Sequence, residues 1–300
     1  METPRAEAPQ LKPLGVGDIV DRVFALYRSR PLLFLALSAV PYLALVLIIV
    51  VLTVATGLTS GLFDVFTQLA AGEAPDPETL APLLASLAAF AVVVTIVAVV
   101  ILSAQSAALI DATSSLYLGR PVTFETAFRS GVRAAPRVIG AGLLLFLGMV
   151  LAWAVLAVVM VLSNQVLVVL VLTLGGLVGT VFILTGTLVT PVAATIEGAG
   201  PVGALQRSWT LSEGNRWRIL GLQFLLIVLN AVISTLLSAV FVGALIGDEN
   251  VRAALQQIVN LVANVAWAPV QWATFAVLYY DLRVRREAFD LQLAAESMPR

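Results

Sequence analysis

Five long stretches of the chain contain no charged residue, and most of their residues are apolar. They run over residues 31–63, 79–110, 138–196, 219–247 and 253–280. Because an α-helix rises about 1.5 Å per residue, about 20 apolar residues cross a hydrocarbon core roughly 30 Å thick. Four of the stretches have the length of one crossing each. The stretch 138–196 would measure about 88 Å as a single helix, so it requires two crossings.

A polar tripeptide, Ser163-Asn164-Gln165, interrupts this longest stretch and predicts a turn between two crossings. The pattern therefore predicts an all-α membrane protein with six transmembrane helices. Their expected spans are about 32–56, 83–110, 138–162, 166–196, 219–246 and 253–280.

A short amphipathic segment precedes the first, third and fifth predicted spans. Apolar residues recur at helical spacing over 16–27, 124–132 and 202–209, with polar and charged residues between them. This pattern is typical of helices that lie in the headgroup layer. Thr123 is placed to cap the second segment, Pro201 suits the first helical position of the third, and Gly214 can end that helix.

The second, fourth and sixth spans end alike, at Asp111, Glu197 and Asp281. The chain therefore favours three repeats of one unit, an interfacial amphipathic helix followed by two spans. The first repeat has a longer outer connection, 57–82, in which a short helix around 61–71 is expected. Pro191 lies near the end of the fourth span and is expected to bend it without interrupting it.

The distribution of basic residues predicts the orientation of the six spans. If both termini are cytoplasmic, every one of the 17 Lys and Arg residues except Arg252 lies in an inner segment. Such asymmetry follows the positive-inside rule. We therefore expect a multi-pass protein of the cell membrane with a disordered cytoplasmic N-terminus (1–14), a single membrane domain (15–293) and a C-terminal tail (294–300).

Composition excludes a water-soluble globular enzyme. Only 12% of residues are charged and 60% are hydrophobic, whereas soluble domains carry about 25% charged residues. The chain contains no Cys and no His, which removes the thiolate nucleophile, the commonest general base and the commonest transition-metal ligand. No cofactor and no metal is expected, and a net charge of −1 gives no indication of nucleic-acid binding.

Three runs of the sequence together resemble a known family. They are Leu278-Tyr-Tyr-Asp-Leu-Arg-Val-Arg-Arg-Glu-Ala-Phe-Asp-Leu291, the run from Ala204 to Gly214 with Trp217-Arg-Ile after it, and Gly15 to Arg28. Over about 14–293 the chain resembles the bacterial glycerophosphoryl diester phosphodiesterase membrane-domain family. Some members of that family carry a fused catalytic domain that uses histidines and metal-binding carboxylates. This chain has no such segment, so the resemblance implies the membrane module without phosphodiesterase activity, and it transfers no site residue.

Two groups of polar residues are candidates for a functional site. The first is an inner-face charge cluster, which either binds a partner or fixes the ends of the helices through ion pairs. We expect Glu197 or Asp281 to pair with one of its arginines, because an unpaired buried carboxylate costs several kcal/mol. The members of this cluster are Asp111, Glu197, Arg207, Arg218, Asp281, Arg283 and Arg285.

The second group consists of amides at membrane depth: Gln105, Asn230, Asn260 and Asn264. Such amides commonly join helices to one another, and less often they line a polar path. A pair of glycines four residues apart, Gly175 and Gly179, has the same two interpretations.

Three functions remain open at this level. The first is a non-enzymatic scaffold or accessory subunit with a cytoplasmic interaction surface. The second is a small transporter or lipid-handling channel. The third is a membrane enzyme, which is disfavoured because no nucleophile–base or metal constellation is visible. The expected partners are membrane lipids and a membrane or cytoplasmic protein.

The predicted orientation has a direct test. Reporter fusions at positions 70, 164 and 249 are expected to report the outer side, and fusions at positions 125, 210 and 295 the inner side, because this arrangement places the arginines inside. One reversed pair of fusions would contradict the six-span topology.

Overall fold

The computed structural model describes residues 13–163, 165–241 and 249–292, and every element in these ranges is a helix. Six of the helices are long and apolar enough to cross a membrane, which confirms an all-α membrane fold. Residues 1–12 of the expected N-terminus, Asn164 of the expected turn, residues 242–246 of the fifth predicted span and the whole expected C-terminal tail (294–300) lie outside the described residues. The helices are α1 (Val16–Ser29), α2 (Pro31–Ala55), α3 (Leu58–Ala70), α4 (Pro77–Tyr117), α5 (Phe124–Ser163), α6 (Val166–Gly186), α7 (Thr190–Ile196), α8 (Pro201–Ser212), α9 (Arg216–Phe241) and α10 (Glu249–Glu287).

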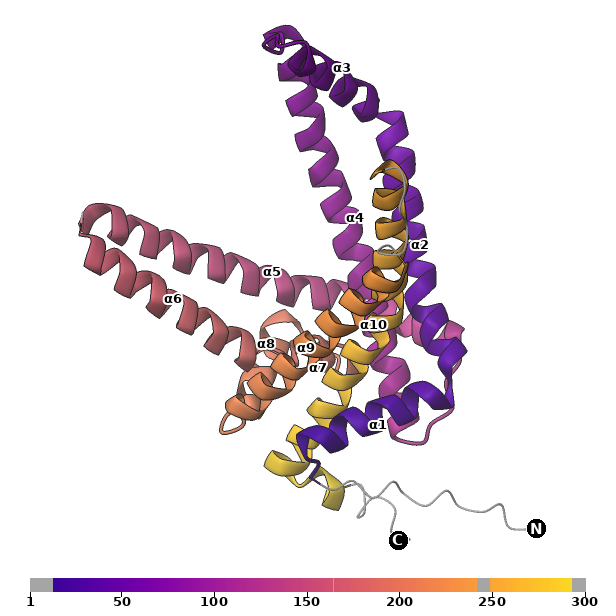
Figure 1. The fold of residues 1–300 in the computed structure, drawn as a ribbon. Coiled ribbons are helices and arrows are strands. Elements are labelled where there is room, and N and C mark those ends of the chain that lie inside the picture. The colour runs from indigo at the N-terminus through magenta and orange to yellow at the C-terminus, as the bar shows by residue number, and fades with distance from the viewer. Residues whose placement is uncertain (1–12, 164, 242–248, 293–300) are drawn as a thin grey trace.

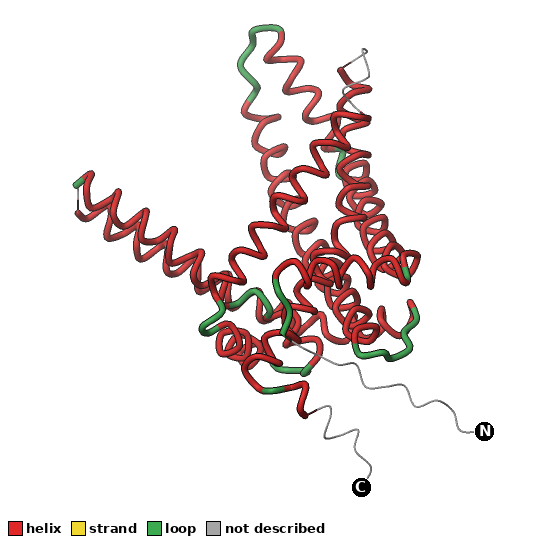
Figure 2. Tube along the Cα trace, turned by 60° about the horizontal axis from the view of Figure 1, so that its bottom comes forward, coloured by secondary structure: helices red, strands yellow, loops and turns green. Residues whose placement is uncertain are grey.

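The long helices form three pairs that meet at a common base, and α10 also packs against α2 and α4 (Figure 1). The pairs are α2 with α4, α5 with α6, and α9 with α10. The base consists of α1, α7, α8 and the ends of the long helices that pack against them. The α5–α6 pair points away from the other helices in Figure 1, and Figure 2 shows the same separation from a second direction.

This divergence leaves most of the apolar helix surface uncovered by the chain itself. The most apolar sections of α4, α5 and α6 contain no buried residue, whereas 56% of the corresponding section of α10 is buried. A helix surface that is apolar and exposed is suited to lipid or to another membrane helix. Helix α10 is therefore the central helix, and the outer halves of the α5–α6 pair face the bilayer.

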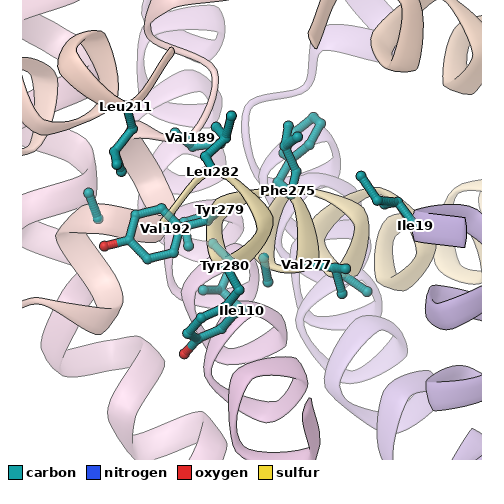
Figure 3. Packing of buried hydrophobic residues seen from close by; sticks show 14 of the residues in the cluster. Ile19, Ile110, Val189, Val192, Leu211, Phe275, Val277, Tyr279, Tyr280 and Leu282 are labelled. Carbon is teal, nitrogen blue, oxygen red and sulfur yellow. The ribbon is translucent and has the colours of Figure 1, made fainter. Parts of the chain in front are cut away.

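The hydrophobic core lies at the base (Figure 3). Tyr279 and Tyr280 of α10 are almost completely buried there, against Ile110 of α4 and Val192 of α7. Tyr117 stacks on Tyr280 with 5.4 Å between the ring centroids. Offset aromatic contacts of this kind add to the free energy that burial of the rings provides. The tightly packed part of the molecule is thus the end of the bundle that carries most of the described arginines.

The fourth predicted span, 166–196, is not one helix, so the expectation of a simple bend at Pro191 is wrong. Helix α6 ends at Gly186 and α7 begins at Thr190. Proline has no N–H to donate to the carbonyl four residues earlier, and its ring collides with that carbonyl. The amide of Thr190 instead donates to the carbonyl of Thr187 at 3.1 Å, which tightens the chain between the two helices.

The interruption leaves the carbonyl of Gly186 without its helical donor. Ser208 of α8 supplies the replacement, since its hydroxyl donates to this carbonyl at 3.0 Å and is fully buried. The ring of Trp209 packs against Gly186, where a Cβ atom would lie only 2.7 Å from the ring. The break in the fourth span is therefore the place where α8 docks.

The segment 124–132 is not a separate interfacial helix. It continues directly into the third span as α5, because Ala134 and Ala135 favour the helix and Pro136 does not end it. The hydroxyl of Thr123 accepts the amide of Thr126 at 3.3 Å, which confirms the expected cap. Helix α8 begins at Pro201, Gly214 follows its C-cap with φ +75°, and α3 occupies the outer connection, as expected. The first and third repeats thus begin with a separate amphipathic helix, whereas in the second repeat this helix is fused with the span.

Gly131 sets the distance between α4 and α5. A Cβ atom at this position would lie 2.7 Å from both the amide nitrogen and the Cβ atom of Ala108. We expect Gly131→Ala to lower the free energy of unfolding by about 1–3 kcal/mol, because the helices must separate to admit the methyl group. Thermal unfolding in detergent measures the change.

Gly148, on the same helix, provides the matched control. A Cβ atom added to Gly148 would meet no atom of another element within 4 Å, so Gly148→Ala is expected to leave the unfolding temperature unchanged or slightly higher. Equal effects of the two substitutions would show that the α4–α5 crossing does not depend on Gly131.

Candidate functional site

A buried carboxylate joins three parts of the chain at the base. The side chain of Asp281, on α10, is fully inaccessible to solvent. It accepts a hydrogen bond from the backbone amide of Leu14 at 2.7 Å and another from the Nε atom of Arg285 at 3.1 Å, and it forms an ion pair with Arg218 of α9. We call these residues the Asp281 network.

The carbonyl of Leu14 completes this arrangement. It accepts a hydrogen bond from Arg285 at 2.8 Å and another from Arg218. The two arginines therefore share a carboxylate and a carbonyl, and every charged side chain in the network has a partner. A buried ion pair repays the loss of hydration only when its remaining donors are also satisfied. Here the segment that leads into α1 supplies those additional partners.

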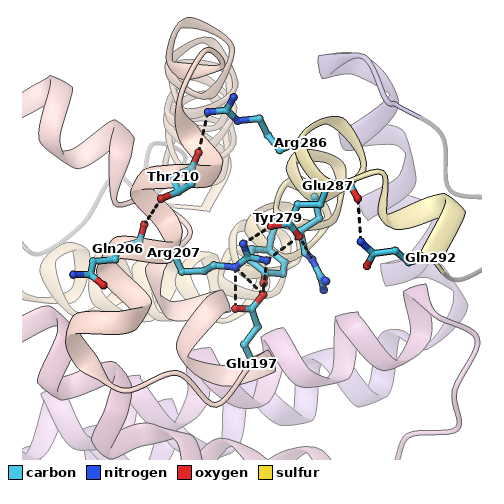
Figure 4. Close-up of polar contacts among 9 residues, drawn as sticks. Glu197, Gln206, Arg207, Thr210, Tyr279, Arg286, Glu287 and Gln292 are labelled. Atoms are coloured by element: carbon cyan, nitrogen blue, oxygen red, sulfur yellow. Dashed lines mark hydrogen bonds and ion pairs between the residues drawn. The ribbon is translucent and has the colours of Figure 1, made fainter.

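A second network surrounds Arg207 (Figure 4). The Nε atom of Arg207, on α8, donates to Glu197 at 2.9 Å, and its Nη2 atom donates to Glu287 at 2.8 Å. Tyr279 donates its hydroxyl hydrogen to Glu197, and Arg283 donates to Glu287 at 3.0 Å. We call these residues the Arg207 network. It connects α7, α8 and α10.

The charges of the Arg207 network balance, with two carboxylates and two guanidinium groups. The hydrogen bond to Glu287, and then that to Glu197, raises the pKa of Arg207. Arg207 thus remains a cation at any physiological pH. Both carboxylates are engaged by donors, so neither is placed to act as a general base.

The predicted charge cluster therefore forms two networks rather than one. Arg218, Asp281 and Arg285 belong to the first, and Glu197, Arg207 and Arg283 to the second. The expected pairing of Glu197 and of Asp281 with arginines is present in the structure.

Asp111, the remaining predicted member of the cluster, is separate from both networks. It accepts the hydroxyl of Ser130 at 3.0 Å and makes no ion pair within the described residues. Its position at the end of a span matches that of Asp281, but no arginine of the described chain is placed to pair with it.

Sequence reasoning missed three participants. Glu287 follows Arg283 by four residues, and this spacing is a usable signal for an ion pair on one helix face. Tyr279 and the backbone of Leu14 carry no such signal, because their contacts span 82 and 267 residues of sequence.

Arg216 is a further residue that the sequence did not single out. Its guanidinium lies 3.8 Å from the ring centroid of Phe182 and 4.0 Å from that of Trp209. A cation between two aromatic faces is stabilised by both ring quadrupoles. Arg216 thereby ties the start of α9 to α6 and α8.

The predicted membrane-depth amides do not form a polar path. Gln105 is buried and donates to the carbonyl and hydroxyl of Ser38, both at 3.2 Å, so it joins α4 to α2. Asn264 donates to the carbonyl of Asn260 at 2.8 Å on the exposed side of α10. Asn230 lies half-buried on α9.

A small pocket of about 170 Å³ brings Gln105 and Asn264 together but does not include Asn260. The two glycines of the fourth span, Gly175 and Gly179, have no atom within 4 Å of the positions that their Cβ atoms would take. They therefore make no close helix contact within the described chain.

A row of arginines borders a larger pocket on the base. Arg129, Arg133 and Arg137 follow one another at four-residue spacing on α5, which places them along one face. They line a cavity of about 460 Å³ together with Ser130 and Thr195. Arg129 pairs with Glu125 at 2.7 Å, but Arg133 and Arg137 form no ion pair within the described residues. Three arginines and one glutamate thus line this pocket, which gives it a net positive charge.

The Asp281 network yields a stability prediction. Asp281→Asn is expected to cost about 3–5 kcal/mol of unfolding free energy, because it leaves Arg218 and Arg285 facing each other without a buried counter-charge. In the Asp281→Asn background, Arg218→Gln is expected to cost less than it does alone. Thermal unfolding of the two single variants and the double variant measures this coupling.

Asp21, an exposed carboxylate on α1, serves as the control for loss of one negative charge. Asp21→Asn is expected to leave the unfolding temperature unchanged. Additive effects of Asp281→Asn and Arg218→Gln would mean that the network does not act as a unit.

Comparison with known proteins gives one family. A family model described as "Domain of unknown function (DUF7847)" matches residues 33–282. No curated protein and no solved structure matches the chain. The matched range contains Asp281 but omits two members of each network, Leu14 and Arg285 from the first and Arg283 and Glu287 from the second. The likeness to the glycerophosphoryl diester phosphodiesterase membrane domain stays a prediction. The chain, with six described helices long and apolar enough to cross a membrane, belongs to the DUF7847 family.

Proposed function

We propose that this protein is a non-enzymatic membrane scaffold or accessory subunit whose base binds an acidic segment of a partner protein. The observation that carries this proposal is the contrast between two sets of arginines. Arg207, Arg218, Arg283 and Arg285 are engaged inside the chain. Arg133 and Arg137 are exposed beside an open pocket and have no described ion pair.

A rigid base whose arginine row has two members, Arg133 and Arg137, without a described ion pair is suited to recognition by charge. The two networks fix α7, α8, α9 and α10 relative to one another, and Gly131 holds α5 close to α4. The arginine row is therefore presented on a preorganised surface, which lowers the cost of binding. Carboxylates of a partner are the complementary groups, and the planar guanidinium favours them through paired hydrogen bonds.

The proposed orientation places the base on the cytoplasmic side of the cell membrane. All described arginines except Arg252 belong to segments that the positive-inside rule assigns to that side. The backbone amide of Leu14 donates to Asp281 near the end of α10. Both ends of the described chain therefore lie on the same side. A cytoplasmic partner would thus reach the arginine row directly.

The proposal of a non-enzymatic role rests on the chemistry of the side chains. The chain has no Cys or His, and its most buried carboxylate, Asp281, is held by two guanidinium groups and an amide. Hydrolytic or transfer chemistry needs a nucleophile with a free base, or a metal.

Lipid handling is a second candidate function. The observation that favours it is a large apolar groove between the diverging helix pairs, lined by α4, α5, α6 and α9. In this role the base would be a structural clamp, and the groove would be the functional surface.

Site-specific photocrosslinking in native membranes separates the two roles. A photoreactive residue at Thr126, which lines the arginine pocket, is expected to give a discrete adduct with a protein. The yield is expected to fall at least fivefold in an Arg133→Gln/Arg137→Gln variant, because each cation contributes to the attraction. A photoreactive residue at Ser29, exposed on α1 outside the pocket, provides the control. Adducts with lipid alone, or equal yields from both positions, would contradict the scaffold.

A further inference from the structure

The diverging helix pairs enclose a groove at membrane depth. Its volume is about 970 Å³, near the upper end of the range of about 300–1,000 Å³ that ligand pockets occupy. Val99 of α4, Phe146 of α5, Leu184 of α6 and Ile227 of α9 contribute to its walls. None of the residues that line it carries a charge. The groove is therefore suited to an apolar molecule and is unsuited to an ion.

Two buried polar atoms in this groove lack a hydrogen-bond partner. They are the hydroxyl oxygen of Thr190, a residue only 5% exposed, and the Oε1 atom of Gln223. More than nine in ten buried polar groups in proteins have a partner. Two exceptions that line the same groove indicate a ligand with polar hydrogens at one end.

The fold explains why Thr190 has no internal partner. The hydroxyl groups of Thr185, Thr187 and Thr195 donate to the carbonyl four residues earlier, at 2.7, 2.9 and 2.7 Å. For Thr190 that carbonyl belongs to Gly186, which lies on the other side of the helix break and accepts the hydroxyl of Ser208 instead. The break before Pro191 thus leaves the Thr190 hydroxyl directed to no group of the described chain.

The position of the two polar atoms defines how a ligand would lie. Thr190 begins α7, beside the base, and Gln223 lies two turns into α9, which also starts at the base. A polar head would therefore sit near the base. A hydrocarbon chain would extend from it along Phe146, Leu184 and Ile227 towards the open side of the groove.

We propose that the groove binds an uncharged single-chain amphiphile, a monoacylglycerol or a molecule of similar polarity. One of its hydroxyl groups would donate a hydrogen bond to the Oε1 atom of Gln223, and another would donate to or accept from the hydroxyl of Thr190. Its hydrocarbon chain would fill the apolar part of the groove. A phosphate or carboxylate head is excluded, because no charged residue of the groove would compensate for its loss of hydration. This proposal does not depend on the scaffold role or on the arginine row.

The test uses Trp272, which lines the groove, as a reporter. The purified full-length protein in detergent is titrated with a monoacylglycerol whose chain carries bromine atoms, and tryptophan fluorescence is recorded. We expect saturable quenching, which a Trp272→Phe variant loses in large part. The brominated fatty acid anion is expected to bind at least tenfold more weakly. Quenching that does not saturate, or that is equal for the two probes, would overturn the proposal.

Substitution of the two partnerless residues makes the test specific. Thr190→Val combined with Gln223→Leu is expected to weaken binding of the monoacylglycerol about tenfold, while the unfolding temperature of the ligand-free protein stays the same or rises. The rise follows because the substitutions remove buried polar atoms that have no partner. If the two residues had a purely structural role, the substitutions would lower the unfolding temperature and leave monoacylglycerol binding unchanged.

Thr185→Val is the matched control, because Thr185 also lines the groove but its hydroxyl is satisfied by the carbonyl of Val181. This variant is expected to bind the monoacylglycerol as the unmodified chain does. If the Thr190→Val/Gln223→Leu variant binds as tightly as Thr185→Val, the two partnerless atoms do not contact a ligand and the proposal is wrong.

Discussion

A carboxylate that is completely removed from water, that of Asp281, determines how this molecule is assembled. A buried charge is tolerated only when opposite charges and hydrogen-bond donors surround it. Asp281 obtains these from α9, from the next turn of α10 and from the backbone at Leu14. The first and last described segments of the chain must therefore meet at the base. The Arg207 network and the cation–π contacts of Arg216 extend the same junction to α6, α7 and α8.

The rest of the architecture follows from concentrating these contacts at one end. Beyond the base α10 still packs against α2 and α4. The described outer parts of α5 and α6 form interhelical hydrogen bonds only with each other, and apolar side chains gain little by leaving lipid for one another. The α5–α6 pair diverges from the other helices, which opens the groove and leaves the most apolar sections of this pair exposed. The break before Pro191 serves the same junction, since it frees the Gly186 carbonyl for Ser208 and leaves Thr190 without a partner.

The six spans and the ion pairing of Glu197 and Asp281 could be predicted, because apolar length and buried charge impose strong constraints that are local in sequence. The break at 187–189 could have been anticipated from Pro191, but the contact with Ser208 that stabilises it could not. The fusion of 124–132 with the third span could not be predicted, because Pro136 allows either a helix end or a continuous helix, and the structure shows the continuous helix. Sequence reasoning could not predict the contacts of Leu14 and Tyr279 or the missing partner of the Thr190 hydroxyl, because these arise from tertiary geometry. Asp111 ends the second span as Asp281 ends the sixth, so sequence reasoning placed both in one charge cluster. The structure gives Asp111 no described counter-ion.

The central claim is that Asp281 holds the segment that leads into α1 against α9 and α10 at the base. Since the chain has no cysteine, spin labels can be attached through Asp21→Cys on α1 and Gln206→Cys on α8, two exposed positions. Pulsed electron resonance of this doubly labelled protein is predicted to give one narrow distance distribution. The same labels in the Asp281→Asn background are predicted to give a broad distribution shifted to longer distances. An unchanged narrow distribution in that background would contradict the account.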